Sequence, residues 1–211
     1  LIWCPFRLLT SPRHFLHHEL PGLRVYLINK LHRLISRRNL WSTMAGTVLD
    51  AWLFGQLWRS YLPLCPSAPA VKARLGGDVV RNDHVAFRTF AHPRLGIAQL
   101  AAPFVAAGYV AGGHYRFEAK KLHATHFERG PGDPKIFVSE LVLEACSPAL
   151  RGRVGALVES VPEAAYDVPL ACDLGRVWAV SYTEFAALRE ESEYAAWVAA
   201  HGLRVNHFTA S

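Results

Sequence analysis

The sequence NDHVAFRTF, residues 82–90, has the alternation of a β-strand. Val85 and Phe87 share one face of this strand, because successive side chains point to opposite sides. His84 and Arg88 share the other face, with a small alanine between them. At a rise of about 3.3 Å per residue, their stems stand about 13 Å apart. We therefore predict room between them for a metal-bound ligand a few carbons long that ends in an acid group.

A second histidine lies in a similar strand-like run, VNHFT at residues 205–209. A single histidine is more often structural than a metal ligand. Two histidines on strands far apart in the sequence, one of them sharing a face with Arg88, are what the walls of a non-haem metal cup need. We therefore take His84 and His207 as candidate metal ligands.

The remaining patterns predict a mixed α+β architecture. Helical spacing or strand alternation predicts the following elements: helices at 47–62, 71–75, 95–107, 148–158 and 183–201, and strands at 79–90, 109–110, 115–117, 122–127 and 135–144. The Gly112-Gly113 pair is read as a turn between two short strands. The order is a βαβββ unit with flanking helices, which curls into half of a barrel. Residues 161–175, rich in Pro and Gly, are expected to connect it to a second, truncated unit.

Composition places the chain among ordinary globular proteins, with 51% apolar and 19% charged residues in a length of 211. The four cysteines are scattered and form no C-x-x-C pair. This pattern indicates a reducing compartment and argues against a cysteine zinc site. No apolar run approaches the roughly 20 residues of a transmembrane helix, so no membrane span is expected.

The net charge of +6 lies entirely in the first fifth of the chain. Residues 1–43 contain seven Lys/Arg and one acid, Glu19, whereas the other 168 residues contain sixteen of each sign. The body of the protein therefore has no basic excess for a phosphate backbone, which argues against a basic-leader protein that binds nucleic acid or a membrane surface.

Residues 1–43 leave three interpretations open: an organellar transit peptide, translated sequence upstream of a start at Met44, or a surface helix with a basic side. The chain also ends four residues after His207. We therefore expect a fragment of a longer protein, with 1–43 as a basic leader or upstream segment. Residues 44–211 would be a partial oxygenase domain that holds the first metal-cup unit, a helical connector and the start of a second unit.

Four runs in the same order resemble the 2-oxoadipate dioxygenase/decarboxylase family, across about residues 48–209. They are NDHVAFRTF (82–90), AKKL (119–122), KIFVSEL (135–141) and GLRVNHFT (202–209). The resemblance implies a vicinal-oxygen-chelate-like fold and an Fe(II) enzyme of lysine catabolism that uses O₂ to convert 2-oxoadipate to 2-hydroxyglutarate, with loss of CO₂.

The resemblance also assigns roles to individual residues. His84 and His207 match the two histidines that bind the metal and, through it, the substrate, and Arg88 matches the catalytic arginine that holds the substrate carboxylate. The third ligand, a glutamate, is expected beyond Ser211. Glu140 is a tempting substitute, but the family does not use it so; it either orients a ligand or pairs with a lysine.

The expected partners are therefore a small 2-oxo acid and O₂, without nucleic acid. The alternative is a catalytically silent scaffold or fragment that keeps the fold and lacks the complete metal triad. The location depends on the source: the cytoplasm for a bacterial protein, and a plastid or other organelle for a plant or algal one.

Overall fold

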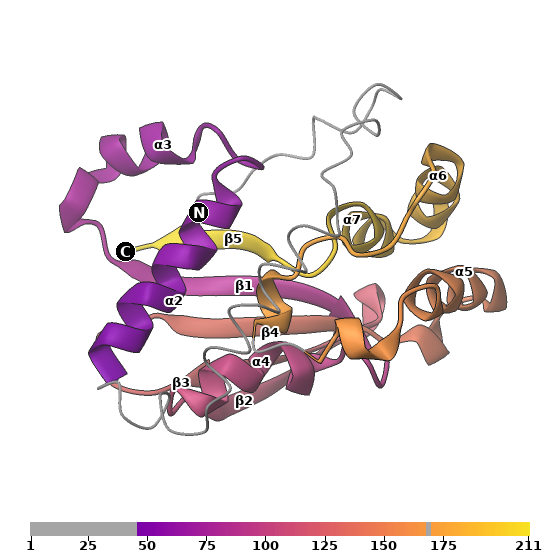
Figure 1. The fold of residues 1–211 in the computed structure, drawn as a ribbon, viewed down its shortest axis with the longest axis horizontal. Helices are drawn as coiled ribbons and strands as arrows, with labels where there is room; N and C mark the ends of the chain where they lie inside the picture. The colour runs from indigo at the N-terminus through magenta and orange to yellow at the C-terminus, as the bar shows by residue number, and fades with distance from the viewer. Residues whose placement is uncertain (1–45, 168–169) are drawn as a thin grey trace.

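The computed structural model describes residues 46–167 and 170–211 (Figure 1). The predicted basic leader, residues 1–43, therefore lies outside the described residues. The helices are α2 (Gly46–Tyr61), α3 (Ala68–Leu75), α4 (Ile97–Ala106), α5 (Pro148–Glu159), α6 (Tyr182–Glu191) and α7 (Glu193–His201). The strands are β1 (Asn82–Phe90), β2 (Val110–Phe117), β3 (Leu122–Glu128), β4 (Lys135–Leu141) and β5 (Val205–Ala210). The sequence from β1 through α4 to β4 confirms the predicted βαβββ order.

The five strands form one sheet in the order β2-β3-β4-β1-β5. β1 lies between β4, to which it is parallel, and β5, to which it is antiparallel. The strand that carries His207, β5, forms one edge of the sheet. Its partner is β1 itself, and this pairing joins the two histidine-bearing segments directly.

Helices cover both faces of the sheet (Figure 1). On the face of Val85 and Phe87, α4 packs through Phe104, whose ring centroid lies 5.5 Å from that of Phe87. α2 packs on the same face, where Trp58 makes an edge contact with Phe208 of β5. On the opposite face, α7 lies over the end of β1, and its Tyr194 hydroxyl donates to the Ser139 carbonyl of β4.

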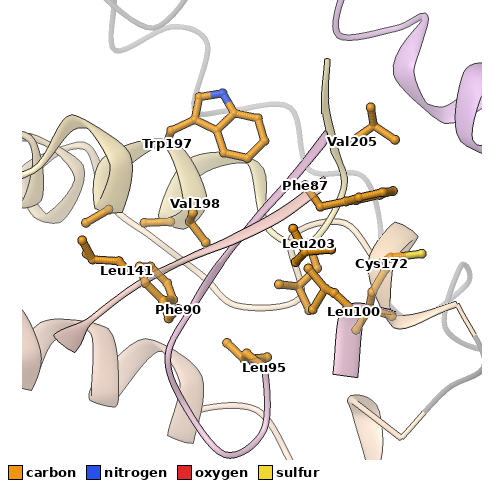
Figure 2. Close-up of a cluster of buried hydrophobic side chains, with 14 of the residues drawn as sticks. Phe87, Phe90, Leu95, Leu100, Leu141, Cys172, Trp197, Val198, Leu203 and Val205 are labelled. Carbon is orange, nitrogen blue, oxygen red and sulfur yellow. The ribbon is translucent and has the colours of Figure 1, made fainter. Parts of the chain in front are cut away.

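The core between these layers is apolar, as the alternation in residues 82–90 predicts. Val85 and Phe87 are fully buried, whereas His84 and Arg88 keep part of their surface exposed. Figure 2 shows Phe87 beside Val205, and Phe90 beneath Val198 of α7. The face of Val85 and Phe87 therefore fixes β1 in the core, and on the opposite face His84 and Arg88 stay partly exposed while Ala86 and Phe90 are buried.

Several expected elements differ from the structure. The helix expected at 183–201 is two helices, because Ser192 is extended (φ −147°, ψ 106°) and its hydroxyl caps α7 by accepting from the Ala195 amide. The strand expected at 79–90 begins at Asn82, after a 3₁₀ turn at Gly77–Val79. The strand expected at 135–144 ends at Leu141, before another 3₁₀ turn.

The Gly112-Gly113 pair is a bulge and not a turn, since β2 runs without interruption through it. A Cβ atom at Gly112 would overlap the side chains of His126 and Glu128 on β3. A side chain at position 112 would therefore have to displace the His126 ring and the Glu128 carboxylate, which lie against the β2 backbone.

Across residues 46–167 and 170–211, no helix combines the length and the apolar character that a bilayer crossing requires.

Candidate active site

The pairing of β1 with β5 brings the two candidate histidines together. His84 lies opposite Thr209, and Ala86 lies opposite His207. Because opposed residues share a face, both imidazoles project from the same side of the sheet. Their ring centroids are 5.7 Å apart, with the ring planes at 75°. Since a histidine nitrogen binds a metal ion at about 2.1 Å, rings at this separation can converge on one cation.

Both histidines follow an extra residue in their strand. The β1–β5 register shifts between Asn82 and His84, which makes Asp83 the extra residue of β1. It shifts again where Phe87 pairs with Val205, which makes Asn206 the extra residue of β5. Bulges of this kind turn a side chain away from simple alternation. Each therefore lets a polar side chain lie beside the ring that follows it.

These two neighbours determine which ring nitrogen carries the proton. Nδ1 of His84 lies 2.7 Å from Asp83 Oδ2, and Nδ1 of His207 lies 2.7 Å from Asn206 Oδ1. Both oxygens can only accept, so each Nδ1 donates and each Nε2 keeps its lone pair. Metal-binding histidines typically donate their other N–H to an oxygen in this way. Nε2 of His84 is 2.9 Å from the Thr209 hydroxyl, which can donate to it.

The electrostatics favour the neutral form of His207. Burial, reinforced by electrostatic repulsion from neighbouring His84 and Arg88, lowers the pKa of His207 to about 4. The ring is therefore uncharged at neutral pH, which is the form that binds a cation.

Arg88 emerges on the same face of β1, two residues beyond Ala86. Its guanidinium carbon lies 5.1 Å from the Tyr194 ring centroid and 5.3 Å from that of Trp197, both on α7. Burial lowers the pKa of Arg88, but an arginine so placed is still a cation at neutral pH. No carboxylate in the described part of the chain pairs with it, so its N–H donors remain available to an acid ligand.

The structure places Glu140 outside this site. Glu140 pairs with Thr89 in register and therefore points to the opposite face from His84. Its carboxylate accepts from the Ile97 amide (3.0 Å) at the start of α4. This contact matches neither interpretation left open by the sequence, because Glu140 orients no ligand and binds a helix N-terminus in place of a lysine.

Two histidines supply only part of a metal-binding set. Within residues 46–167 and 170–211 there is no group of three or more His, Cys, Asp or Glu side chains that could hold a metal ion. His84 and His207 thus fit a cation as a pair of nitrogen donors, and a complete metal site would need ligands beyond this pair. The sequence patterns missed Asp83, Asn206 and Tyr194; the paired runs Asp83-His84 and Asn206-His207 are the signal that could have indicated the first two.

Comparison with known proteins agrees with the resemblance seen in the sequence. A profile of the 2-oxoadipate dioxygenase/decarboxylase family matches residues 68–167, a range that includes His84 and Arg88. A rice protein named 2-oxoadipate dioxygenase/decarboxylase, chloroplastic/amyloplastic, is 36% identical over 148 residues, which are 64% of this chain and 41% of the rice protein. The chain is related to this family. The resemblance to this family that the four sequence runs indicated is therefore confirmed.

Solved structures extend the relationship to the fold. A rice hydroxyglutarate synthase in complex with 2-oxoadipate is 32% identical, with a TM-score of 0.70 over 77% of this chain and 58% of that one. A glyoxalase-superfamily protein from Ralstonia eutropha is 21% identical, with a TM-score of 0.60 over 77% of this chain and 62% of that one, and shares the fold. The α+β fold class of the vicinal-oxygen-chelate type is therefore confirmed. The chain spans less than half the length of the curated relatives, 41% and 47%.

Proposed function

We propose that the chain is part of an Fe(II)-dependent dioxygenase/decarboxylase of lysine catabolism. The reaction takes 2-oxoadipate and O₂ to 2-hydroxyglutarate and CO₂. The observation that carries the proposal is the shared face of β1 and β5. It presents the imidazoles of His84 and His207, whose ring centroids are 5.7 Å apart. It also presents the Arg88 guanidinium, which forms no ion pair with an acid among the described residues. A 2-oxo dicarboxylate needs both: a metal for the oxo acid and a cation for the far carboxylate.

The histidines would hold the iron through Nε2. Asp83 and Asn206 keep the Nδ1 protons in place, so that both lone pairs point to the metal without a change of tautomer. When bound, Fe(II) supplies the electron transfer to O₂ that protein side chains cannot provide. The low pKa of His207, about 4, means that no proton has to leave this ring before it binds at neutral pH.

Arg88 would bind the far carboxylate of the substrate and fix its distance from the metal. The planar fork of arginine can make two parallel hydrogen bonds to a carboxylate, and its charge is permanent. The spacing from His84 to Arg88, about 13 Å along the strand, leaves room for a six-carbon acid. The 2-oxoadipate in the rice hydroxyglutarate synthase structure supports this choice of substrate.

The third, carboxylate ligand is proposed to lie beyond Ser211, and residues 44–211 to form one partial oxygenase domain preceded by the segment 1–43. The plastid named for the rice relative supports a plastid location if the source is a plant or an alga.

The experiment is oxygen uptake by the complete protein that contains this chain, with ferrous iron and 2-oxoadipate, and with chromatographic detection of 2-hydroxyglutarate. We expect one product molecule per O₂ consumed, and loss of at least 99% of the rate in His84→Ala. The matched control is His123→Ala on β3, whose side chain points to the other face because His123 pairs with Glu140. Absence of product from the wild-type protein would overturn the proposal.

The silent-scaffold alternative has one observation in its favour, the lack of a third metal ligand in the described residues. A silent protein would show neither oxygen uptake nor a stoichiometric Fe(II) site in the complete protein. Iron binding at one equivalent together with turnover excludes this alternative.

A further inference from the structure

Arg88 is held in an unusual way for a cation that is partly shielded from water. Buried arginines are ordinarily neutralised by acids, which also occupy their N–H donors. Here two aromatic rings from one helix take that place, Tyr194 at 5.1 Å and Trp197 at 5.3 Å from the guanidinium carbon. Ring faces attract a cation through their quadrupole and leave all five N–H donors free.

The Tyr194 ring is anchored to two neighbouring strands, β4 and β1. Its hydroxyl donates to the Ser139 carbonyl (2.7 Å), lies 3.0 Å from the Ser139 hydroxyl, and accepts from the Thr89 amide (3.2 Å). Ser139 is the register partner of Arg88 across β1 and β4. The ring is therefore fixed relative to the backbone from which the guanidinium extends.

Trp197 continues the same face of α7 one turn later, and His201 follows after another turn. The Trp197 and His201 ring centroids lie 4.8 Å apart, with the ring planes tilted by 36°. Burial, and then the positive charges of Arg204, Arg176 and Arg88, lower the pKa of His201 to about 4. This ring pair is therefore neutral at physiological pH, and His201 packs against the indole without adding a charge of its own.

We propose that Tyr194 and Trp197 are positioning residues for Arg88, and that this aromatic clamp sets selectivity for acids with a second carboxylate. Both rings lie within cation–π distance of the guanidinium, and no acid among the described residues pairs with it, so its N–H donors are left to the ligand. The inference rests on the proposed function for the identity of the acid, but the clamp itself can be tested without any turnover.

The test that needs no activity is the rate at which phenylglyoxal modifies Arg88, measured by peptide mass spectrometry and normalised to the exposed Arg151. In Trp197→Leu, release of the guanidinium should raise the rate at least fivefold. Trp178→Leu is the matched control, because this buried indole donates to the Ala199 carbonyl on the same helix and should change the rate less than twofold. If Trp197→Leu does not fold, Trp197→Phe should still raise it two- to threefold.

The second test compares 2-oxoadipate with 2-oxohexanoate, which has the same chain length and lacks the far carboxylate. Trp197→Leu should raise KM about tenfold for the diacid and less than twofold for the monoacid, whereas Trp178→Leu should affect both alike. An unchanged Arg88 labelling rate, or equal changes of KM for the two acids, overturns the clamp. A wild-type protein that converts neither acid overturns the proposed function, and the labelling rates then decide the clamp alone.

Discussion

Replacement of Arg88 is the most informative perturbation of the proposed substrate site. Arg88→Met removes the charge and keeps an unbranched apolar side chain near Tyr194 and Trp197, whose rings lie close to the guanidinium in the wild type. A bound carboxylate then faces two aromatic rings and a thioether, without the N–H donors of the guanidinium. Loss of one partner from a shielded, hydrogen-bonded charge pair costs about 2–5 kcal/mol. The expected loss of kcat/KM for 2-oxoadipate is thus about 30-fold at the lower bound.

Arg88→Lys separates charge from geometry. A lysine ammonium keeps the positive charge, but it is not planar and cannot make two parallel hydrogen bonds to one carboxylate. We expect a loss of about tenfold, corresponding to about 1.4 kcal/mol. The additional loss of kcat/KM in Arg88→Met compared with Arg88→Lys would then measure the contribution of the charge alone.

The assay is kcat/KM in the complete protein, measured by oxygen uptake with 2-oxoadipate and, in parallel, with 2-oxohexanoate. Both variants should change the value for the monoacid by less than twofold, because that substrate has nothing for Arg88 to bind. The reasoning is refuted if Arg88→Met leaves turnover of the diacid unchanged, or if it reduces turnover of both acids equally.

Three further predictions concern stability and the metal ligands. Gly202→Ala should destabilise the protein by about 3 kcal/mol or more in urea unfolding, because Gly202 has φ +73° and an added Cβ would overlap the Gly175 backbone; an unchanged midpoint would contradict this. His201 has a pKa of about 4 in the folded state, below its usual 6.5, so the stability it contributes is complete above pH 6.5 and is lost as the pH falls toward 4. The expected loss at pH 5 relative to pH 8 is about 2 kcal/mol, and His201→Gln should remove this part of the pH dependence. Asp83→Asn should weaken Fe(II) binding about tenfold or more in an anaerobic titration, because Asp83 orients His84; equal affinity would show that the carboxylate has no such role.

Local patterns predicted the parts of this fold that depend on near neighbours. The alternation in residues 82–90 correctly separated the buried Val85 and Phe87 from the face of His84 and Arg88. Helical spacing and strand alternation likewise predicted the βαβββ order of the elements. Short-range hydrophobic periodicity carries this information because it reflects burial of one face.

The same local patterns could not predict which strands pair over long sequence separations. Nothing local to residues 205–209 indicates that β5 pairs with β1, more than a hundred residues earlier, and yet this pairing is what brings the histidines together. The break at Ser192 was missed because apolar spacing continues through it, while the capping hydroxyl ends one helix and begins another. The Tyr194 contact with Arg88 likewise depends on where α7 docks, which is a property of the packed molecule.

The central claim is that His84 and His207 bind one metal ion. The most direct measurement is anomalous diffraction at the iron edge from crystals of the complete protein grown with Fe(II) without oxygen. We predict a single peak about 2.1 Å from Nε2 of both histidines. A peak at any other place, or none at a full equivalent of bound iron, would contradict the account.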